Sequence, residues 1–332
     1  MNTYQRLFGL IVLLGATAGA AIGRGALEAS VGPAVLNFPG QSLGTITFMP
    51  PEGRSSFMFI GPHQRMSQAV GEVHLPKGQM CYLTVSYDAA VDPSVFAKCL
   101  PNQIAVLNFD KLPITNAGLK NIEHLTGLVG LELRDTDIGD AGLEHIAKVR
   151  SLECLDLDST NITAVGVASL KPLNNMLTLS LARNPIGGSC LTVMRSFPRL
   201  RILDIKQMRL TDKSLLSLIG MNNLEDLDVS NNRDITASGL SQLASLRKLR
   251  GLHIEGTDVQ PQDASVFRNF PHLELLYIGG SSFVDADGPK WHKVLPQVKV
   301  AVLHDRNSKI PMELFNPHNG NYKLPGHSAS GF

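Results

Sequence analysis

This sequence has few cysteines and almost no net charge. It contains four cysteines in 332 residues, too few for a fold held together mainly by disulfides. Thirty basic and 29 acidic side chains nearly cancel, so the chain as a whole has no field that would attract nucleic acid or an anionic membrane. With 43% hydrophobic and 18% charged residues, the composition is that of a folded protein. Any electrostatic recognition must come from the local arrangement of charged side chains.

Signatures of nucleotide and metal sites are missing as well. The sequence contains no G-x-x-x-x-G-K-[ST], no G-x-G-x-x-G after a strand, no H-E-x-x-H and no C-x-x-C, and its ten histidines have no ligand spacing. We therefore expect no catalytic residue, no cofactor and no metal, and interpret the protein as non-enzymatic. An enzyme would need residues 26–79 to hold a site, and no catalytic groups converge there.

The first 25 residues resemble an export signal. Arg6 precedes the apolar run LFGLIVLLG, and the small-residue stretch ATAGAAIG follows with an A-x-A site at Ala18–Ala20. A second interpretation is an uncleaved membrane anchor, because residues 7–23 carry no charge and approach the length needed to span a bilayer. Both interpretations place the rest of the chain outside the cytoplasm, as a secreted, periplasmic or membrane-anchored protein.

Residues 26–79 are predicted to form a small β-rich capping segment. Short apolar or alternating runs at Leu43–Met49, Ser56–Ile60 and Glu72–Leu75 are separated by turns rich in proline and glycine. A turn at Leu75–Gly78 would join the third run to the strand that follows. We expect this hairpin to cover the exposed strand edge at that end of the chain.

A 24-residue sequence segment is repeated from Leu128 onward. LVGLELRDTDIGDAGLEHIAKVRS is followed by LECLDLDSTNITAVGVASLKPLNN, with apolar residues at matching positions such as Leu131 and Leu155. The first apolar positions of the same register are Met80, Ile104, Leu128, Leu152, Met176, Leu200, Leu224, Leu249, Leu273 and Val298. A period of this length indicates a solenoid, in which each unit buries its apolar face against its neighbours.

The spacing inside one unit predicts a strand followed by a helix. L-x-x-L-x-L ends with period 2, which is typical of a short strand, and Leu143, Ile146 and Val149 then follow helical spacing. Thr163, Asp140 and related residues precede the helical segments as candidate caps. We predict an α/β fold, a curved solenoid over residues 80–303 with a parallel concave sheet and convex helices, and a C-terminal cap and tail at 304–332.

These units resemble the leucine-rich-repeat superfamily. The L-x-x-L-x-L-x-x-(Asn/Thr)-x-(Ile/Leu) pattern stands here as LVGLELRDTDI, LECLDLDSTNI, MLTLSLARNPI and LEDLDVSNNRDI, with Met208 in place of the usual Asn or Thr in one repeat. The repeat pattern is similar to that of the ribonuclease-inhibitor-like branch. With its N-terminal segment, the chain is also similar to exported bacterial members of the superfamily. The resemblance covers Met80–Leu303 and implies a binding scaffold without naming a partner.

The strand side chains that point away from the leucines carry the candidate site. Neighbouring strands lie about 4.8 Å apart, so these outward positions form columns across the sheet. The middle column is Asn108, Glu132, Asp156, Ser180, Asp204, Asp228, His253 and Tyr277, and a mixed-sign third column includes Asp110, Arg134 and Asp158. The middle column places Glu132 beside Asp156 and Asp204 beside Asp228, and we expect the fold to gain nothing from that repulsion.

Three interpretations of this face stay open. It could be a solvated surface, an acidic groove for a basic protein segment, or a calcium site at Asp204, Asp226 and Asp228, although a flat parallel sheet rarely supplies enough oxygens. The predicted partner-binding residues are Glu132, Asp156, Asp158, Asp204, Asp226, Asp228, His253 and Tyr277. The predicted function is protein binding through this face, and the alternative is a structural or spacer protein of the cell envelope.

Two cysteines could form a disulfide in an exported chain. Cys99 ends one repeat and Cys81 lies near the adjacent strand, so a bridge between them stays open. Cys154 and Cys190 fall in different layers of the repeat and are not expected to pair. The single tryptophan, Trp291, is expected to fill the core of the last unit.

Overall fold

The computed structural model describes residues 35–49, 66–280, 283–284 and 286–303. The predicted export signal or anchor at 1–25, the run Ser56–Ile60 and the tail 304–332 lie outside these ranges. Within them, no helix combines the length and the apolar composition that crossing a membrane requires.

The backbone of the fold is a twelve-stranded sheet in the order β14-β13-β12-β11-β10-β9-β8-β7-β6-β5-β2-β3. From β5 onward the strands are parallel, and each pairs with its neighbour in sequence. Their bounds are β5 Met80–Val85, β6 Val106–Asn108, β7 Gly130–Glu132, β8 Cys154–Asp156, β9 Thr178–Ser180, β10 Ile202–Asp204, β11 Asp226–Asp228, β12 Gly251–His253, β13 Leu275–Gly279 and β14 Lys299–Leu303. The predicted parallel solenoid sheet is confirmed.

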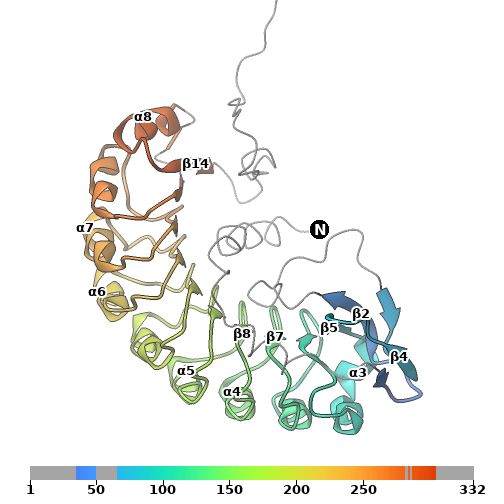
Figure 1. Ribbon diagram of the computed structural model, residues 1–332. Helices are drawn as coiled ribbons and strands as arrows, with labels where there is room; N and C mark the ends of the chain where they lie inside the picture. Colours follow the sequence, from blue (N-terminus) through green and yellow to red (C-terminus); the bar gives the residue numbers. More distant parts are fainter. Residues whose placement is uncertain (1–34, 50–65, 281–282, 285, 304–332) are drawn as a thin grey trace, which may run out of the picture.

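Short helices connect these strands and line the outside of the arc, while the strands line its inside (Figure 1). The α-helices are α3 Tyr87–Val91, α4 Asp140–Ile146, α5 Ala164–Ser169, α6 Asp212–Leu215, α7 Ala237–Ser241 and α8 Asp287–Val294. The 3-10 helices are η4 Pro93–Lys98, η5 Ala117–Ile122, η6 Gly188–Ser196, η7 Leu216–Leu218, η8 Gln242–Ser245 and η9 Pro261–Asn269. Neighbouring strands lie about 4.8 Å apart, whereas packed helices need about 8–10 Å, so the stack curves with its strands on the inside.

The core lies between these two layers and is built from the predicted apolar columns. Leu131, Leu155 and Leu179 are fully buried on successive strands, and the same column continues along the array. Trp291 is buried in α8 as expected, with its ring 5.5 Å from that of Phe267 and its Nε1 donating to the carbonyl of Pro261. The last described unit is therefore closed by aromatic packing.

An antiparallel segment covers the β5 edge, but its pairing differs from the predicted hairpin. The strand beside β5 is β2 (Gly44–Met49), which also pairs with β3 (Met66–Gln68). The predicted hairpin strand, β4 (Glu72–His74), pairs instead with β1 (Val35–Asn37). Gly44 has φ +140°, and a Cβ there would lie 2.1 Å from the Thr84 carbonyl oxygen, so glycine permits the close approach of the two strands.

Buried amides hold the turns that follow the strands. The Nδ2 group of Asn184 donates to the carbonyls of Leu157 and Leu181, and its Oδ1 accepts from the backbone N–H of Thr160. Asn232 makes the same kind of contacts two repeats later. Because each amide bonds two repeats, these side chains fix the spacing between turns as well as the turn itself.

On the outer side, the predicted caps divide into two roles. Thr163 and Thr236 are N-caps, with side chains that accept from backbone N–H groups of α5 and α7. Asp140 instead lies inside α4, where its carboxylate accepts from both the backbone N–H and the hydroxyl of Thr163 in the next repeat. The predicted capping role of Asp140 is thus corrected to a link between repeats.

All four cysteines are buried free thiols. The bridge that the sequence left open between Cys81 and Cys99 is not formed. Burial raises the pKa of the Cys99 thiol to about 11, which keeps it in the less reactive protonated form.

Candidate binding face

The concave face is the inner surface of strands β5 to β14, on the side opposite the leucine core. The register places Glu132 opposite Asp156, Asp204 opposite Asp228 and His253 opposite Tyr277. The predicted adjacency of these side chains is therefore confirmed.

These side chains are buried, however, which excludes the solvated-surface interpretation. Glu132 is 4% exposed, Asp204 1% and His253 1%. The third column is more open, since Asp110, Lys206 and other members are half-buried. Ionised groups in such surroundings need partners, because desolvation of an unpaired charge is costly.

The fold supplies one reason for most of the aspartates. The Oδ1 atoms of Asp156, Asp204 and Asp228 each accept the backbone N–H two residues further on, at 2.9, 3.1 and 2.9 Å. Asn108 does the same at 2.9 Å. This is an Asx turn, which ends the strand and redirects the chain. The expectation that the fold gains nothing from these carboxylates is wrong for the three aspartates.

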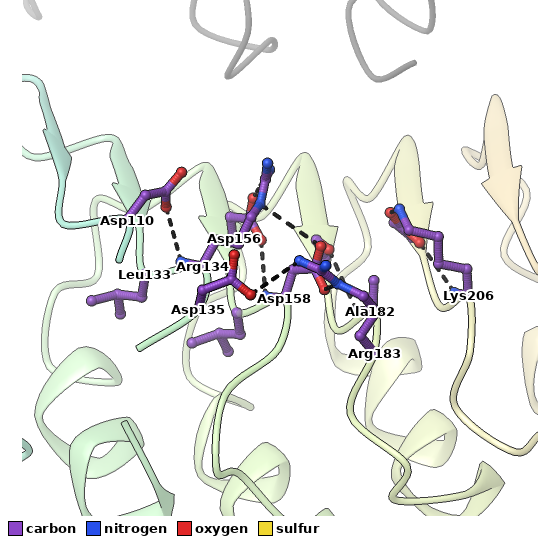
Figure 2. Close-up of polar contacts among 12 residues, drawn as sticks. Asp110, Leu133, Arg134, Asp135, Asp156, Asp158, Ala182, Arg183 and Lys206 are labelled. Carbon is purple, nitrogen blue, oxygen red and sulfur yellow. Dashed lines mark hydrogen bonds and ion pairs between the residues drawn. The ribbon is translucent and has the colours of Figure 1, made fainter. Parts of the chain in front are cut away.

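Basic side chains supply a second reason. The Arg134 Nη2 atom lies 2.6 Å from an oxygen of Asp156, and its Nε lies 3.7 Å from Asp158 (Figure 2). Arg183 approaches Asp158 from the other side at 2.7 Å and reaches Asp135 at 3.3 Å. The coulombic attraction of Asp156 raises the pKa of the Arg134 guanidinium above its ordinary value, so this cation is part of the folded structure.

Lys206 has the same role further along the sheet. It forms an ion pair with Asp204 and lies 3.8 Å from Asp228. Burial lowers the pKa of the Lys206 ammonium, but the attraction of the surrounding carboxylates outweighs burial and raises it overall. Burial raises the pKa of Asp204 to about 7, with the neighbouring Asp228 acting in the same direction.

At the β5 end, Tyr82 joins the site. Its hydroxyl donates to Glu132 Oε2 at 2.9 Å and accepts from Asn108 Nδ2 at 2.8 Å, while the same amide donates to Glu132 at 2.5 Å. Sequence reasoning missed Tyr82, although it is in register with Val106, which lies two residues before Asn108 and so on the same side of the sheet. Burial raises the pKa of Glu132 well above its ordinary range, and the charge of Asp110 adds to the effect.

The other end of the face has a different arrangement. The rings of His253 and Tyr277 stack with centroids 4.3 Å apart, and His253 Nε2 lies 3.5 Å from Asp226 Oδ1. The carboxylate of Asp226 lies over Gly251, where a Cβ would meet its Oδ2 at 1.9 Å. The missing side chain of Gly251 therefore leaves the room that the Asp226 carboxylate occupies.

Unpartnered polar atoms concentrate on this face. In the part of the chain that the structure describes, the buried side-chain atoms without a hydrogen-bond partner are Thr47 Oγ1, Glu132 Oε1, Arg134 Nε, Asp226 Oδ1, His253 Nδ1 and Nε2, and Tyr277 OH. Thr47 pairs in register with Tyr82, so it shares that side of the sheet. Arg134 Nε has an ion-pair contact with Asp158 at 3.7 Å, and Asp226 Oδ1 has one with His253 Nε2 at 3.5 Å. Each of the remaining atoms, Thr47 Oγ1, Glu132 Oε1, His253 Nδ1 and Tyr277 OH, costs about 1–3 kcal/mol of stability when it is left unsatisfied.

The predicted residues thus fall into two groups. Asp156, Asp158, Asp204 and Asp228 have partners within the sheet, as described above. Glu132, Asp226, His253 and Tyr277 form no strand-end turn of the Asx type, and each has a buried polar atom that makes no hydrogen bond.

Two chemical alternatives find no support among the described residues. No group of three or more metal-binding side chains occurs there, so Asp204, Asp226 and Asp228 do not form the calcium site considered above. The segment Gly40–Gly44 matches G-x-S-x-G, but Ser42 precedes a strand, and its hydroxyl lies within hydrogen-bond distance of the Gly44 carbonyl and of Gln68 Oε1. A nucleophile of that type sits between a strand and a helix.

Comparison with known proteins identifies the repeat. The family model described as Leucine Rich repeat matches residues 127–147, 150–171 and 220–244. No curated protein matches the chain.

Two solved structures from Listeria monocytogenes strain 4b F2365 are similar. Internalin C2 is 24% identical, with a TM-score of 0.46, and the match covers 61% of this chain and 82% of that one. Internalin InlF is 14% identical, with a TM-score of 0.38, covering 68% and 81%. With both TM-scores below 0.5, neither structure informs the partner of this chain.

Proposed function

For this chain, which is a leucine-rich-repeat protein, we propose a non-enzymatic function: binding another protein through the concave face, with a basic segment of that protein as the ligand. Leucine-rich repeats are typically binding scaffolds, because their sheet presents an extended concave surface. The observation that carries the proposal is the concentration of unpartnered buried polar atoms on this face. Natural folds rarely leave such atoms without a role.

The charge of the face favours a basic ligand. On the first half of the face, around β6 to β10, the basic groups Arg134, Arg183 and Lys206 are surrounded by six carboxylates: Asp110, Glu132, Asp135, Asp156, Asp158 and Asp204. On the second half, around β11 to β13, His253 is surrounded by Asp226, Asp228 and Glu255. In both halves carboxylates outnumber basic groups, so a negative potential remains after internal pairing.

The proposal is tested with variants that leave the strand-end turns intact. Glu132→Gln with Asp226→Asn removes two carboxylates that each have an oxygen without a hydrogen bond, while Asp156, Asp204 and Asp228 keep their turns. Asp88→Asn with Glu144→Gln removes two exposed carboxylates from outer helices and serves as the matched control. Circular dichroism and thermal unfolding establish that both double variants are folded.

Full-length wild type and both double variants are immobilised and exposed to proteins from the source organism. We expect the wild type and the control to retain the same proteins, the face variant to lose them, and added salt to weaken retention because the attraction is electrostatic. Identical retention by the face variant and the wild type would contradict the proposal. A second face variant, Asp110→Asn with Glu255→Gln, repeats the test at half-buried positions.

A further inference from the structure

The carboxyl groups of the concave face are crowded beyond what its own cations can neutralise. Glu132 and Asp156 are direct neighbours across β7 and β8, and Asp204 and Asp228 are direct neighbours across β10 and β11. Like charges this close in a buried setting cannot all be ionised without a counter-charge, and the usual response is that some keep a proton.

Glu132 provides an independent sign that a ligand is expected at this place. Its Oε2 accepts from Tyr82 and from Asn108, whereas its Oε1 is buried without a partner. The charged groups that face it are Asp110, Asp156 and Arg134. A cationic donor that reaches Oε1 would satisfy that atom and favour the ionised carboxylate.

Asp110 and Asp204 are in comparable surroundings. Asp110 accepts the backbone N–H of Arg134 at 2.9 Å and is faced by Asp156, Asp135 and the Arg134 side chain. Asp204 is faced by Lys206 on its own strand end and by Asp228 and Asp158 from other strands.

We infer that this face takes up a basic partner in exchange for protons. Asp110, Glu132 and Asp204 hold protons in the free protein and release them to solvent when lysine or arginine side chains of the partner enter the face. The inference rests on the proposed function and adds its regulation by pH. Burial raises the pKa of Asp110 and of Asp204 to about 7, which supports exchange near neutrality.

Proton linkage fixes the direction of the pH dependence. Since the bound state holds fewer protons, binding strengthens as pH rises, and one proton released per complex corresponds to about tenfold in affinity per pH unit. Lysine side chains stay charged through this range, so a change in the partner's own charge does not confound the result.

The experiment uses octalysine as the probe and isothermal titration calorimetry on the full chain. Titrations at pH 7 in phosphate and in Tris, which differ in ionisation enthalpy, give the number of protons exchanged. We expect about 2 protons released per complex at pH 7, about half a proton each from Asp110 and Asp204 and about one from Glu132, whose pKa is raised further, and affinity that rises between pH 5 and pH 8.

Two single variants locate the titrating groups. Asp110→Asn and Asp204→Asn keep an amide oxygen that can accept the same backbone N–H, and each should reduce the protons released and flatten the pH profile. Glu144→Gln, on the outer side of α4, should leave both unchanged.

The outcomes separate the two proposals. Octalysine that binds without releasing protons, or variants that leave the release unchanged, would overturn the exchange alone. Failure of octalysine to bind at any pH would overturn both the exchange and the basic ligand.

Discussion

The two halves of the concave face use the same repeat positions in different ways. Around β7 to β10, Arg134 and Lys206 occupy the third column and pair with the middle-column aspartates. Around β11 to β13, the corresponding positions are Ser230, Glu255 and Gly279, and His253 is the only cation at a middle- or third-column position of these strands. The third column therefore supplies the cations that pair with the aspartates of the first half, whereas Glu132 on β7 and Asp226, His253 and Tyr277 in the second half keep buried polar atoms without a hydrogen bond.

The largest difference should appear when a cation of the first half is removed. Arg134→Met leaves Asp156 and Asp158 buried beside each other with less neutralisation, and we expect a loss of about 3–5 kcal/mol in the free energy of unfolding. Urea denaturation at pH 7 measures it. Lys148→Met is the control, since Lys148 is 57% exposed and pairs with Glu123 on the outer side, where an ion pair contributes under about 1 kcal/mol. Equal losses of unfolding free energy in Arg134→Met and Lys148→Met would show that the ion pairs of the concave face contribute no more than an exposed one.

The two halves should also lose stability in different pH ranges. Asp204 has its pKa raised from 3.8 to about 7, so its contribution to stability is complete below pH 3.8 and is lost as pH rises through 7. Burial lowers the pKa of His253, but Asp226 and further carboxylates raise it overall from 6.5 to about 9. Its contribution is complete below pH 6.5 and is lost as pH rises through 9, a step of about 3 kcal/mol.

Unfolding free energies measured between pH 4 and pH 10 test this separation. Asp204→Asn should reduce the loss of stability between about pH 4 and 7 and leave the loss between about pH 6.5 and 9 unchanged. His253→Gln should reduce the loss at the higher pH and leave the loss at the lower pH unchanged. An alkaline decline that persists in His253→Gln would show that another group causes it.

The smallest effect comes from a matched pair of tyrosines. Tyr82→Phe removes a hydroxyl with partners on Glu132 and Asn108, and we expect a loss of about 1–3 kcal/mol. Tyr277→Phe removes a buried hydroxyl that has no partner, so stability should stay unchanged or increase. Thermal unfolding of the two variants side by side measures the contrast, and a larger loss in Tyr277→Phe would reverse the assignment of the halves.

The sequence predicted the solenoid because its evidence is periodic. Every repeat places an apolar residue at the same buried positions, so a repeat that departs from the pattern does not change the register assigned from the others. Met208, which departs from the ladder pattern, does not disturb the register, because its backbone N–H donates to Asn232 of the next repeat. The antiparallel pairing of β2 and β5 has no repeat to support it, and there the predicted hairpin was wrong.

The candidate site was predictable only in part. Spacing placed Glu132 beside Asp156 and His253 beside Tyr277 correctly, since strand register follows from the repeat. Spacing alone did not distinguish an aspartate that makes a strand-end turn from a glutamate with an unpartnered oxygen. That distinction depends on side-chain length and on neighbours from other repeats, such as Tyr82 for Glu132, 50 residues apart in the chain.

By itself, the sequence determined the parallel sheet, the direction in which each strand side chain points, and the identity of the adjacent residues on the concave face. These properties depend on local periodicity, and a short-range pattern is enough to specify them. Only the tertiary structure decided how deeply those carboxylates are buried, which of them Arg134, Arg183 and Lys206 neutralise, and which atoms are left without partners. Those properties depend on the curvature that brings successive strands together, because burial and charge pairing are set by all neighbours in space and not by position along the chain.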